Sequence, residues 1–530
     1  MTNKRELELY FHIPFCVRKC LYCDFLSAPA DGRIRVRYMD ALIREAKERA
    51  GDYRDYRVVS VFIGGGTPTI VPPEQIARLL DTVREGYELE EDAEITIEAN
   101  PGTVDEKTLQ LYFQAGINRL SIGLQSADNR ELAALGRIHT YGQFLGTYHM
   151  ARKCGFSNIN VDLMSALPGQ TLPCWLGTLE KVLALEPPPE HISAYSLILE
   201  EGTPFYEMEQ KGEIRLPDED CDRTMYEKTK ERLEWAGYHR YEISNYALPG
   251  YECRHNCGYW RRREYLGLGI GAASLIGNVR FRNGDSLEDY LDDPLGAREE
   301  VQELSLQEQM EEYMFLGLRM TEGVSVAGFR EFFGVGMEDI YGDVIEKNLR
   351  EGLLEYRKDA PADQKISCQA GLGQYSPEDG DKPCRNGNTG EESDPCRNGN
   401  AGEEPGSCWS GNAGEESGSC GGGNVGEEPG SCRSGNAGEE LDLCRGGNMG
   451  EEPDLCRGGN TGEEPGSCGG GNAGEESGSC RGGDLGRENQ SVGQDNSALG
   501  GSQMNPAERR LALTRRGIDV SNMVMAQFLL

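Results

Sequence analysis

Residues 10–25 of this chain read Tyr-Phe-His-Ile-Pro-Phe-Cys-Val-Arg-Lys-Cys-Leu-Tyr-Cys-Asp-Phe. The stretch places Cys16, Cys20 and Cys23 at the spacing C-x3-C-x2-C, directly after the apolar run Leu7–Ile13, which we predict to be a β-strand. Three thiolates on one short loop can bind three corners of a cubane iron–sulfur cluster, whereas a closed structural zinc site needs a fourth ligand. The spacing therefore predicts a [4Fe–4S] cluster with one iron open to a further ligand.

The composition of the chain excludes several classes of protein. Its 530 residues are enough for two or three domains, and its formal net charge of −35 argues against nucleic acid and anionic membranes as electrostatic partners. We expect neither an integral membrane segment nor a signal peptide, because no apolar run approaches the length that either requires. Eighteen cysteines without such a signal indicate the thiols and metal ligands of a cytoplasmic protein rather than disulfides.

Six β-like runs alternate with amphipathic segments, such as Val36–Ala50 and Pro73–Arg84, up to about residue 240. This alternation predicts a parallel sheet with helical crossovers, and six units fit a partial, open (β/α)6 barrel better than a closed barrel of eight. The predicted strands are Leu7–Ile13, Val58–Ile63, Ile95–Glu98, Arg119–Leu124, Ile159–Met164 and His191–Leu199.

Unusual residues fall at or near the carboxyl ends of these predicted strands. The cysteine loop follows the first strand, Gly64–Pro68 the second and Glu98–Pro101 the third; Gln125 ends the fourth, and Asp162 lies on the fifth. Barrels of this kind build their sites at the carboxyl ends of the strands, so we expect these residues to meet there. Consecutive glycines would let a ligand approach the backbone with no Cβ in the way.

These motifs resemble the radical S-adenosylmethionine (radical SAM) superfamily, in which SAM binds the open iron through its amino and carboxylate groups. The resemblance implies that the reduced cluster gives one electron to the sulfonium of SAM. For Arg137 and Asp162, the residues alone equally allow a surface cation on a helix and a cap at a strand end. The SAM-lining positions that the resemblance implies are Tyr10, Tyr22, Gly65, Gly66, Thr67, Glu98, Gln125, Arg137 and Asp162.

Residues 5–360 and 506–530 resemble in particular the HemW family of haem chaperones, which are similar to oxygen-independent coproporphyrinogen III oxidases. Besides the cysteine loop, the motif His255-Asn256-x-x-Tyr259-Trp260 carries this resemblance. True coproporphyrinogen dehydrogenases have a fourth cysteine where this chain has Phe25, and a longer N-terminal extension. The resemblance implies a protein that binds haem and transfers it to client haemoproteins, including membrane-bound respiratory clients.

His255 is the haem-binding residue that the resemblance implies. A neutral imidazole is a common axial ligand of haem iron, and Tyr259 and Trp260 beside it could pack against a porphyrin. A buried histidine satisfied by its neighbours is the alternative, and Cys253 and Cys257 are alternative ligands. Three other cysteines fall in helical patterns and are expected in the core, namely Cys154, Cys174 and Cys221.

The chain beyond residue 300 reads as a small α+β domain. Helical patterns are followed by two strands, Leu353–Arg357 and Arg510–Thr514, which we expect to pair as in a winged-helix-like fold, with a helix from Asp519 to the end. Between the strands, residues 361–505 carry 26 acidic and 9 basic residues and repeat a cysteine every twelve residues from Cys384 to Cys480. We predict that this insertion is disordered, because its units lack apolar surface. The predicted helices are Ser305–Met320, Val326–Phe333 and Met337–Glu351.

The sequence thus predicts four parts. They are a radical SAM partial barrel (1–240), a connecting region with the HNxxYW motif (241–300), a winged-helix-like domain (301–360 plus 506–530) and the repeat insertion (361–505). Three other functions stay open: a coproporphyrinogen III dehydrogenase, another radical SAM enzyme such as a methyltransferase or cyclopropanase, and a zinc or scaffold protein dominated by the cysteine repeat.

Overall fold

The computed structural model describes residues 4–296, 298–358 and 509–529. Six parallel strands, adjacent in chain order, form the centre of its large sheet. The six strands that the sequence predicts are therefore confirmed, with ends that differ by a few residues. They are β1 (Arg5–Ile13), β2 (Tyr56–Gly65), β3 (Leu89–Ala99), β4 (Arg119–Gln125), β5 (Ile159–Ser165) and β6 (His191–Ser196).

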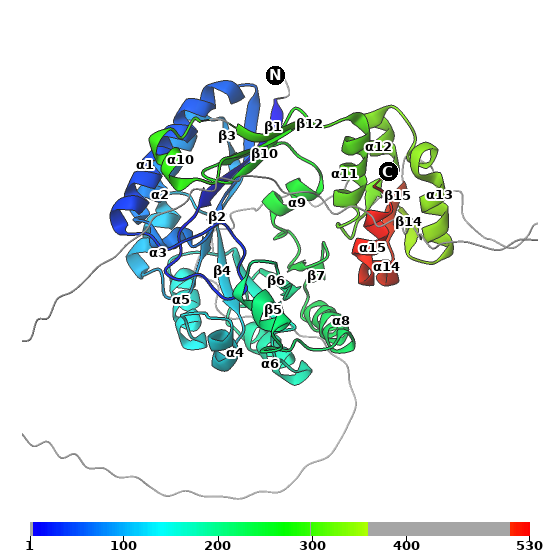
Figure 1. The fold of residues 1–530 in the computed structure, drawn as a ribbon, viewed down its shortest axis with the longest axis horizontal. Helices are drawn as coiled ribbons and strands as arrows, with labels where there is room; N and C mark the ends of the chain where they lie inside the picture. The colour runs from blue at the N-terminus through cyan, green and yellow to red at the C-terminus, as the bar shows by residue number, and fades with distance from the viewer. Residues whose placement is uncertain (1–3, 297, 359–508, 530) are drawn as a thin grey trace, which may run out of the picture. The chain divides into compact units, whose positions relative to one another are not determined.

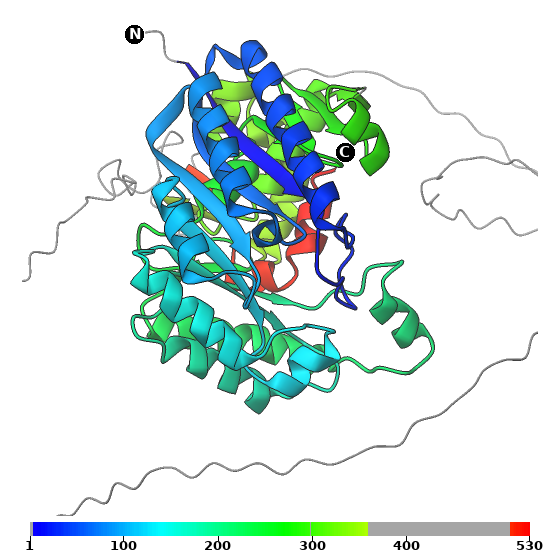
Figure 2. The same cartoon turned by 90° about the vertical axis from the view of Figure 1, so that its left-hand side faces the viewer.

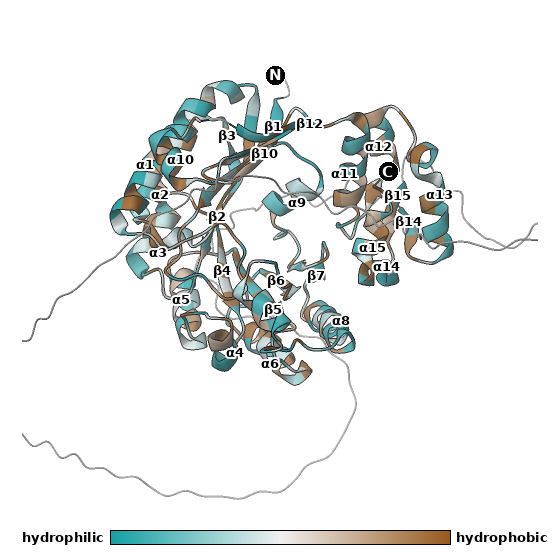
Figure 3. Cartoon of the chain, viewed as in Figure 1, coloured by the Kyte–Doolittle hydropathy of each residue, from teal (hydrophilic) through white to brown (hydrophobic). Residues whose placement is uncertain are grey.

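Helices cover the outer face of these strands (Figures 1 and 2). The helix α1 shows how the sequence decides this packing: it buries Tyr38, Met39, Leu42 and Ala46, while most of its charged residues lie on the other side and Glu45 is buried with hydrogen bonds of its own. Figure 3 shows the same mixture of apolar and polar residues on the other helices, as expected of amphipathic crossovers. The covering helices are α1 (Gly32–Arg49), α2 (Pro73–Gly86), α3 (Glu106–Gln114), α4 (Asn129–Ala134), α5 (Tyr141–Lys153), α6 (Leu172–Leu183) and α8 (Glu219–Trp235). The short helix α7 (Pro204–Gln210) instead contacts the segment of the predicted cysteine loop, where the Phe205 amide donates to the Leu21 carbonyl at 3.0 Å.

The region 241–300 does more than connect, because it extends the sheet at both edges. At one edge β9 (Tyr265–Leu268) adds a parallel strand beside β1, and three antiparallel pairings continue outward from it. At the other edge, β8 pairs with β6 and forms a hairpin with β7. The predicted domain boundary at residue 240 falls inside this hairpin. The other strands here are β7 (His239–Arg240), β8 (Asn245–Ala247), β10 (Ala273–Ile276), β11 (Val279–Asn283) and β12 (Arg298–Glu303), and α10 spans Leu287–Asp292.

The C-terminal part has a core of its own, built around residues such as Met314, Phe329 and Leu511. Its three-stranded sheet has the order β13-β15-β14, and β14 pairs with β15 from Leu354↔Leu513 to Lys358↔Arg509. The sequence predicts that pairing, the three helices before it and the last helix, whereas it misses β13 and the helix at Arg515–Asp519. The elements are α11 (Leu306–Gly317), β13 (Val324–Ser325), α12 (Val326–Phe333), α13 (Met337–Arg350), β14 (Leu354–Lys358), β15 (Arg509–Leu513), α14 (Arg515–Asp519) and α15 (Ser521–Ala526).

The fold class is therefore confirmed: an α/β partial barrel is followed by a small α+β domain. The predicted disordered insertion, residues 361–505, lies outside the described residues. Among the helices of the described ranges, none is both long and apolar enough to cross a membrane.

Candidate functional site

The cysteine loop lies between β1 and α1 and is closed at its base. Phe15 pairs with Ala28 as an isolated bridge, and the Cys16 amide donates a hydrogen bond to the Ala28 carbonyl at 3.2 Å. Cys16, Cys20 and Cys23 carry no disulfide and line one cavity of about 450 Å³. The loop thus brings the three predicted cluster ligands to the carboxyl end of the first strand.

The donors around these sulfurs fit thiolates. Thr67 Oγ1 donates to Cys16 Sγ at 3.5 Å, and Arg137 Nη1 donates to Cys20 Sγ at 3.8 Å. Both donors can stay hydrogen-bonded to sulfur when it binds iron, whereas burial raises the pKa of the third thiol, Cys23. In the described part of the chain, no three His, Cys, Asp or Glu side chains are arranged to hold a single metal ion. A cubane cluster differs from a single-ion site, because each of its cysteines binds a different iron and the sulfurs need not converge on one point. The donor set therefore fits a cluster.

The glycine motif after β2 serves the packing of the cysteine loop. Gly65 has φ +110°, and a Cβ on Gly66 would lie 2.6 Å from the Phe15 carbonyl oxygen. The Gly66 amide also donates to the Ile13 carbonyl at 2.8 Å. Side chains at these positions would push the loop away from β2. From the sequence we expect these glycines to let a ligand approach the backbone. The structure shows a second role, which is the close packing of the cysteine loop against the end of β2.

Two half-buried carboxyl groups, those of Glu98 and Asp162, face the same cavity. Glu98 Oε2 accepts a hydrogen bond from the Gly65 amide at 3.2 Å, and burial, together with the nearby Asp162 charge, raises the pKa of Glu98 to about 8. Burial also raises the pKa of Asp162, although Asn160 and Ser121 donate hydrogen bonds to it. A ligand that donates hydrogen bonds or carries positive charge would stabilise the ionised form of both carboxyl groups.

A half-buried arginine, Arg137, supplies the opposite charge to the cavity. Arg137 Nη2 donates to Asn100 Oδ1 at 2.6 Å and to the Gly123 carbonyl at 2.5 Å, which fixes the guanidinium beside Cys20. Gln125 adds an amide: it has φ +70°, uncommon for a non-glycine residue, and its Oε1 accepts a hydrogen bond from Tyr195 at 3.1 Å. A cavity with a fixed cation and two carboxyl groups suits a ligand that carries both an amino and a carboxylate group.

The structure brings most of the predicted site together but not all of it. Tyr10 does not line the cavity: its hydroxyl pairs with His12 Nδ1 at 3.0 Å, behind Glu98. His255 does not line it either, whereas its neighbour Asn256 does. Asn100, Tyr195 and Asn256 also line the cavity, although the predicted SAM-lining set lacks them. The sequence already places Asn100 and Tyr195 at the ends of the third and sixth strands, where a site is expected. The predicted residues that line the cavity are Cys16, Cys20, Cys23, Tyr22, Gly65, Gly66, Thr67, Glu98, Gln125, Arg137 and Asp162.

His255 lies on α9 (Arg254–Trp260) with its ring packed inside the protein. Its Nδ1 pairs with Ser60 Oγ at 2.9 Å and its Nε2 with Tyr259 Oη at 3.0 Å, while the ring stacks on Phe62. The side chain is 1% exposed, and burial lowers its pKa to about 3, so the imidazole is neutral. Both nitrogens are engaged, and the haem role that the resemblance implies for His255 stays a prediction.

The helix α9 separates two cavities. Asn256 lines the cavity with the cysteines, whereas Cys257 and Trp260 line a second cavity of about 940 Å³. A chain of hydrogen bonds also joins the two: Tyr241 Oη pairs with His191 Nε2 at 2.8 Å, His191 Nδ1 with Asn160 Oδ1 at 2.6 Å, and Asn160 Nδ2 with Asp162 Oδ1 at 2.7 Å. Tyr241 lines the second cavity and Asp162 the first.

Known proteins share these features. Residues 10–182 match the Radical SAM superfamily, and residues 304–360 match the HemN C-terminal domain. The chain is 39% identical to "Heme chaperone HemW" of Lactococcus lactis, over 65% of this chain and 90% of that protein. It is 37% identical to the protein of the same name from Bacillus subtilis (66% and 93% covered). It is 36% identical to "Radical S-adenosyl methionine domain-containing protein 1, mitochondrial" of Mus musculus (66% and 82% covered).

A solved structure supports the fold. Coproporphyrinogen III oxidase (HemN) from Escherichia coli, described as a radical SAM enzyme, superposes with a TM-score of 0.58 at 24% identity. The match covers 66% of this chain and 85% of that one. At this identity the likeness concerns the arrangement of the backbone and not the reaction.

Proposed function

This chain belongs to the HemW family of radical SAM proteins, and from that premise we propose that it is a haem chaperone, which binds haem and passes it to client haemoproteins. The observation that carries the proposal is the 39% identity to a HemW protein along 90% of that protein's length. The described domains are those that the family requires: a partial barrel with a cysteine loop and a HemN-type C-terminal domain.

The radical SAM domain implies a [4Fe–4S] cluster and SAM. Cys16, Cys20 and Cys23 would hold the cluster, which supplies one electron to the sulfonium of SAM when both are bound. Glu98 would accept hydrogen bonds from the SAM amino group, and Arg137 would pair with its carboxylate, because these are the complementary groups in the cavity. The other residues proposed to line SAM are Tyr22, Gly65, Gly66, Thr67, Gln125 and Asp162, whereas Tyr10 lies outside the cavity.

We further propose a cytoplasmic location and clients among haemoproteins, membrane-bound respiratory ones included. The eight described cysteines carry no disulfide, which is typical of a reducing compartment. Phe25, at the position of the fourth cysteine of coproporphyrinogen dehydrogenases, is more than half exposed beside Cys23 and has no ligating atom. Delivery of haem therefore accounts for this loop better than oxidative decarboxylation of a porphyrinogen.

A haem titration tests the proposal. We expect the cluster-reconstituted chain, kept anaerobic, to bind haem saturably at about one per chain, with the Soret band as the readout. Serum albumin and a cluster-free sample serve as references for non-specific binding and for dependence on the cluster. Absence of saturable binding would overturn the proposal, and SAM cleavage in the presence of coproporphyrinogen III would then be the assay to run.

A further inference from the structure

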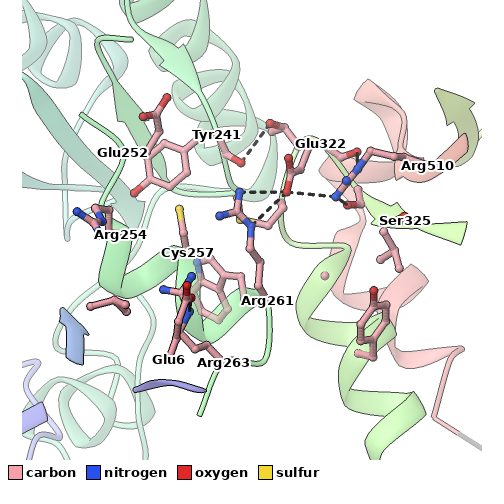
Figure 4. A pocket seen from close by; sticks show the side chains of 18 of the residues that line it. Glu6, Tyr241, Glu252, Arg254, Cys257, Arg261, Arg263, Glu322, Ser325 and Arg510 are labelled. Carbon is pink, nitrogen blue, oxygen red and sulfur yellow. Dashed lines mark hydrogen bonds and ion pairs between the residues drawn. The ribbon is translucent and has the colours of Figure 1, made fainter. Parts of the chain in front are cut away.

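The second cavity, of about 940 Å³, lies between α9 and the strands β13–β15 of the C-terminal part. Tyr241, Cys257 and Met320 form its buried apolar floor, and Trp260 packs against them. Figure 4 shows the Cys257 sulfur on the side of the cavity where Tyr241 and Arg261 lie. An aromatic and thioether floor suits a flat apolar ligand with a polarisable ring.

The wall of this cavity is basic, in contrast to the net charge of −35 of the whole chain. Seven lysines and arginines line it against four glutamates. On one side Arg261 and Arg510 both approach the same Glu322 oxygen at 3.2 Å, so one carboxylate is shared by two guanidinium groups (Figure 4). The cationic residues are Arg57, Arg254, Arg261, Arg263, Arg357, Lys358 and Arg510. Each of the six arginines is paired with a carboxylate of the lining or next to it, so a ligand with two negative groups would bind here by sharing these guanidinium groups with the carboxylates.

We propose that this cavity is the haem site, with the Cys257 thiolate as axial ligand of the iron and the basic wall facing the two propionates. The inference rests on the proposed function, because haem is taken from it as the cargo. It places the ligand on Cys257 rather than on His255, which does not line this cavity and has both ring nitrogens engaged.

Cys257 lies in the floor of the cavity, in one buried cluster with Tyr241 and Met320. A coordinated thiol loses its proton outright, and here that proton passes to water as the iron–sulfur bond forms. Thiolate ligation of haem iron is well established chemistry. The step needs no oxidant or reductant.

The test uses the full chain, with its cluster reconstituted and all ten cysteines of residues 359–508 replaced by serine, so that those thiols cannot compete for haem. Haem is titrated into this parent chain and into its Cys257→Ser variant. The parent should show the red-shifted ferrous–CO Soret band of a thiolate-ligated haem. Cys257→Ser should lose that band and bind haem at least about tenfold more weakly. Loss of a residue that only hydrogen-bonds to a metal ligand already costs about tenfold in affinity, and loss of the ligand itself should cost no less.

Three matched variants separate ligation from folding and charge. His255→Gln and Cys174→Ser, the latter at an exposed cysteine of α6, should both keep the thiolate band. Lys358→Glu reverses an exposed charge of the wall and should weaken haem and metal-free protoporphyrin alike, most at low salt. Cys257→Ser should bind metal-free protoporphyrin as the parent does, since no iron is present.

The outcomes distinguish this inference from the proposed function. If the parent binds one haem and Cys257→Ser keeps both the affinity and the spectrum, the site is elsewhere and the chaperone proposal stands. If only His255→Gln loses haem while metal-free protoporphyrin still binds to it, His255 is the ligand and the inference is wrong. If the parent binds no haem, both the inference and the proposed function fail.

Discussion

Replacement of Cys20 by alanine should remove the iron–sulfur cluster from this chain altogether. A site-differentiated cubane is held by three thiolates, and two thiolates leave a second iron without a protein ligand. The variant should fold, because Cys20 lies on a loop and is only half-buried, outside the hydrophobic core clusters. We expect the iron content of the anaerobically reconstituted protein to fall from about four per chain to near zero, with loss of the brown absorbance.

The control for this experiment is Cys174→Ala. Cys174 is exposed on α6, so the expectation of a core position was wrong for it, and it does not line the cluster cavity. This variant should keep the full cluster. An unchanged spectrum in Cys20→Ala, or equal losses in the two variants, would show that the cysteine loop does not hold the cluster.

Glu98→Gln should weaken SAM binding by about 10- to 100-fold, the usual effect of losing a hydrogen bond to a charged group. The substitution keeps the shape of the side chain and an oxygen for the Gly65 amide, but it removes the carboxyl group, which can ionise when the SAM amino group binds beside it. Equilibrium binding of SAM to the cluster-loaded protein measures the effect. Glu190→Gln is the matched control, because Glu190 pairs with Arg152 away from the cavity. Equal affinities of Glu98→Gln and the parent would exclude the proposed role.

The same variant has a second, independent signature in stability. Folding raises the pKa of Glu98 from its usual 4.5 to about 8, so the folded state binds more protons than the unfolded state between these values. Stability of the ligand-free chain should therefore fall as pH rises through this window, and part of that fall should vanish in Glu98→Gln. Thermal unfolding at pH 5 and pH 9 measures it. A Glu98→Gln variant with the same pH dependence as the parent would contradict the burial of an ionisable Glu98.

The central strands could be predicted because apolar and β-branched residues recur along each of them and turn residues bound them. The edge strands could not: β7 to β11 have five or fewer residues each, too few for a pattern to emerge. The sequence shows alternating glycines at Gly267, Gly269 and Gly271, but not the contacts that require each of them. A Cβ on Gly267 would collide with the Ala273 carbonyl in the neighbouring strand, which is a tertiary constraint.

The first cavity was predictable because its residues follow strands in a known order, and the carboxyl ends of parallel strands meet. The second cavity was not, since Glu6, Arg57, Cys257, Glu322 and Arg510 come from distant segments and carry no local signal. The surroundings of His255 could not be predicted from the sequence either. The motif around it is visible in the sequence, but its hydrogen bonds to Ser60 and Tyr259 appear only in the fold.

Transfer of haem tests the central claim most directly. The cluster-loaded chain, carrying one haem, is mixed with the apo form of a respiratory haemoprotein, and in parallel with apomyoglobin, which takes up haem that has dissociated passively. We predict that the respiratory acceptor gains haem faster than apomyoglobin does, and that its rate rises with acceptor concentration. Equal rates for the two acceptors, independent of concentration, would mean passive release and would contradict the assignment of this chain as a haem chaperone.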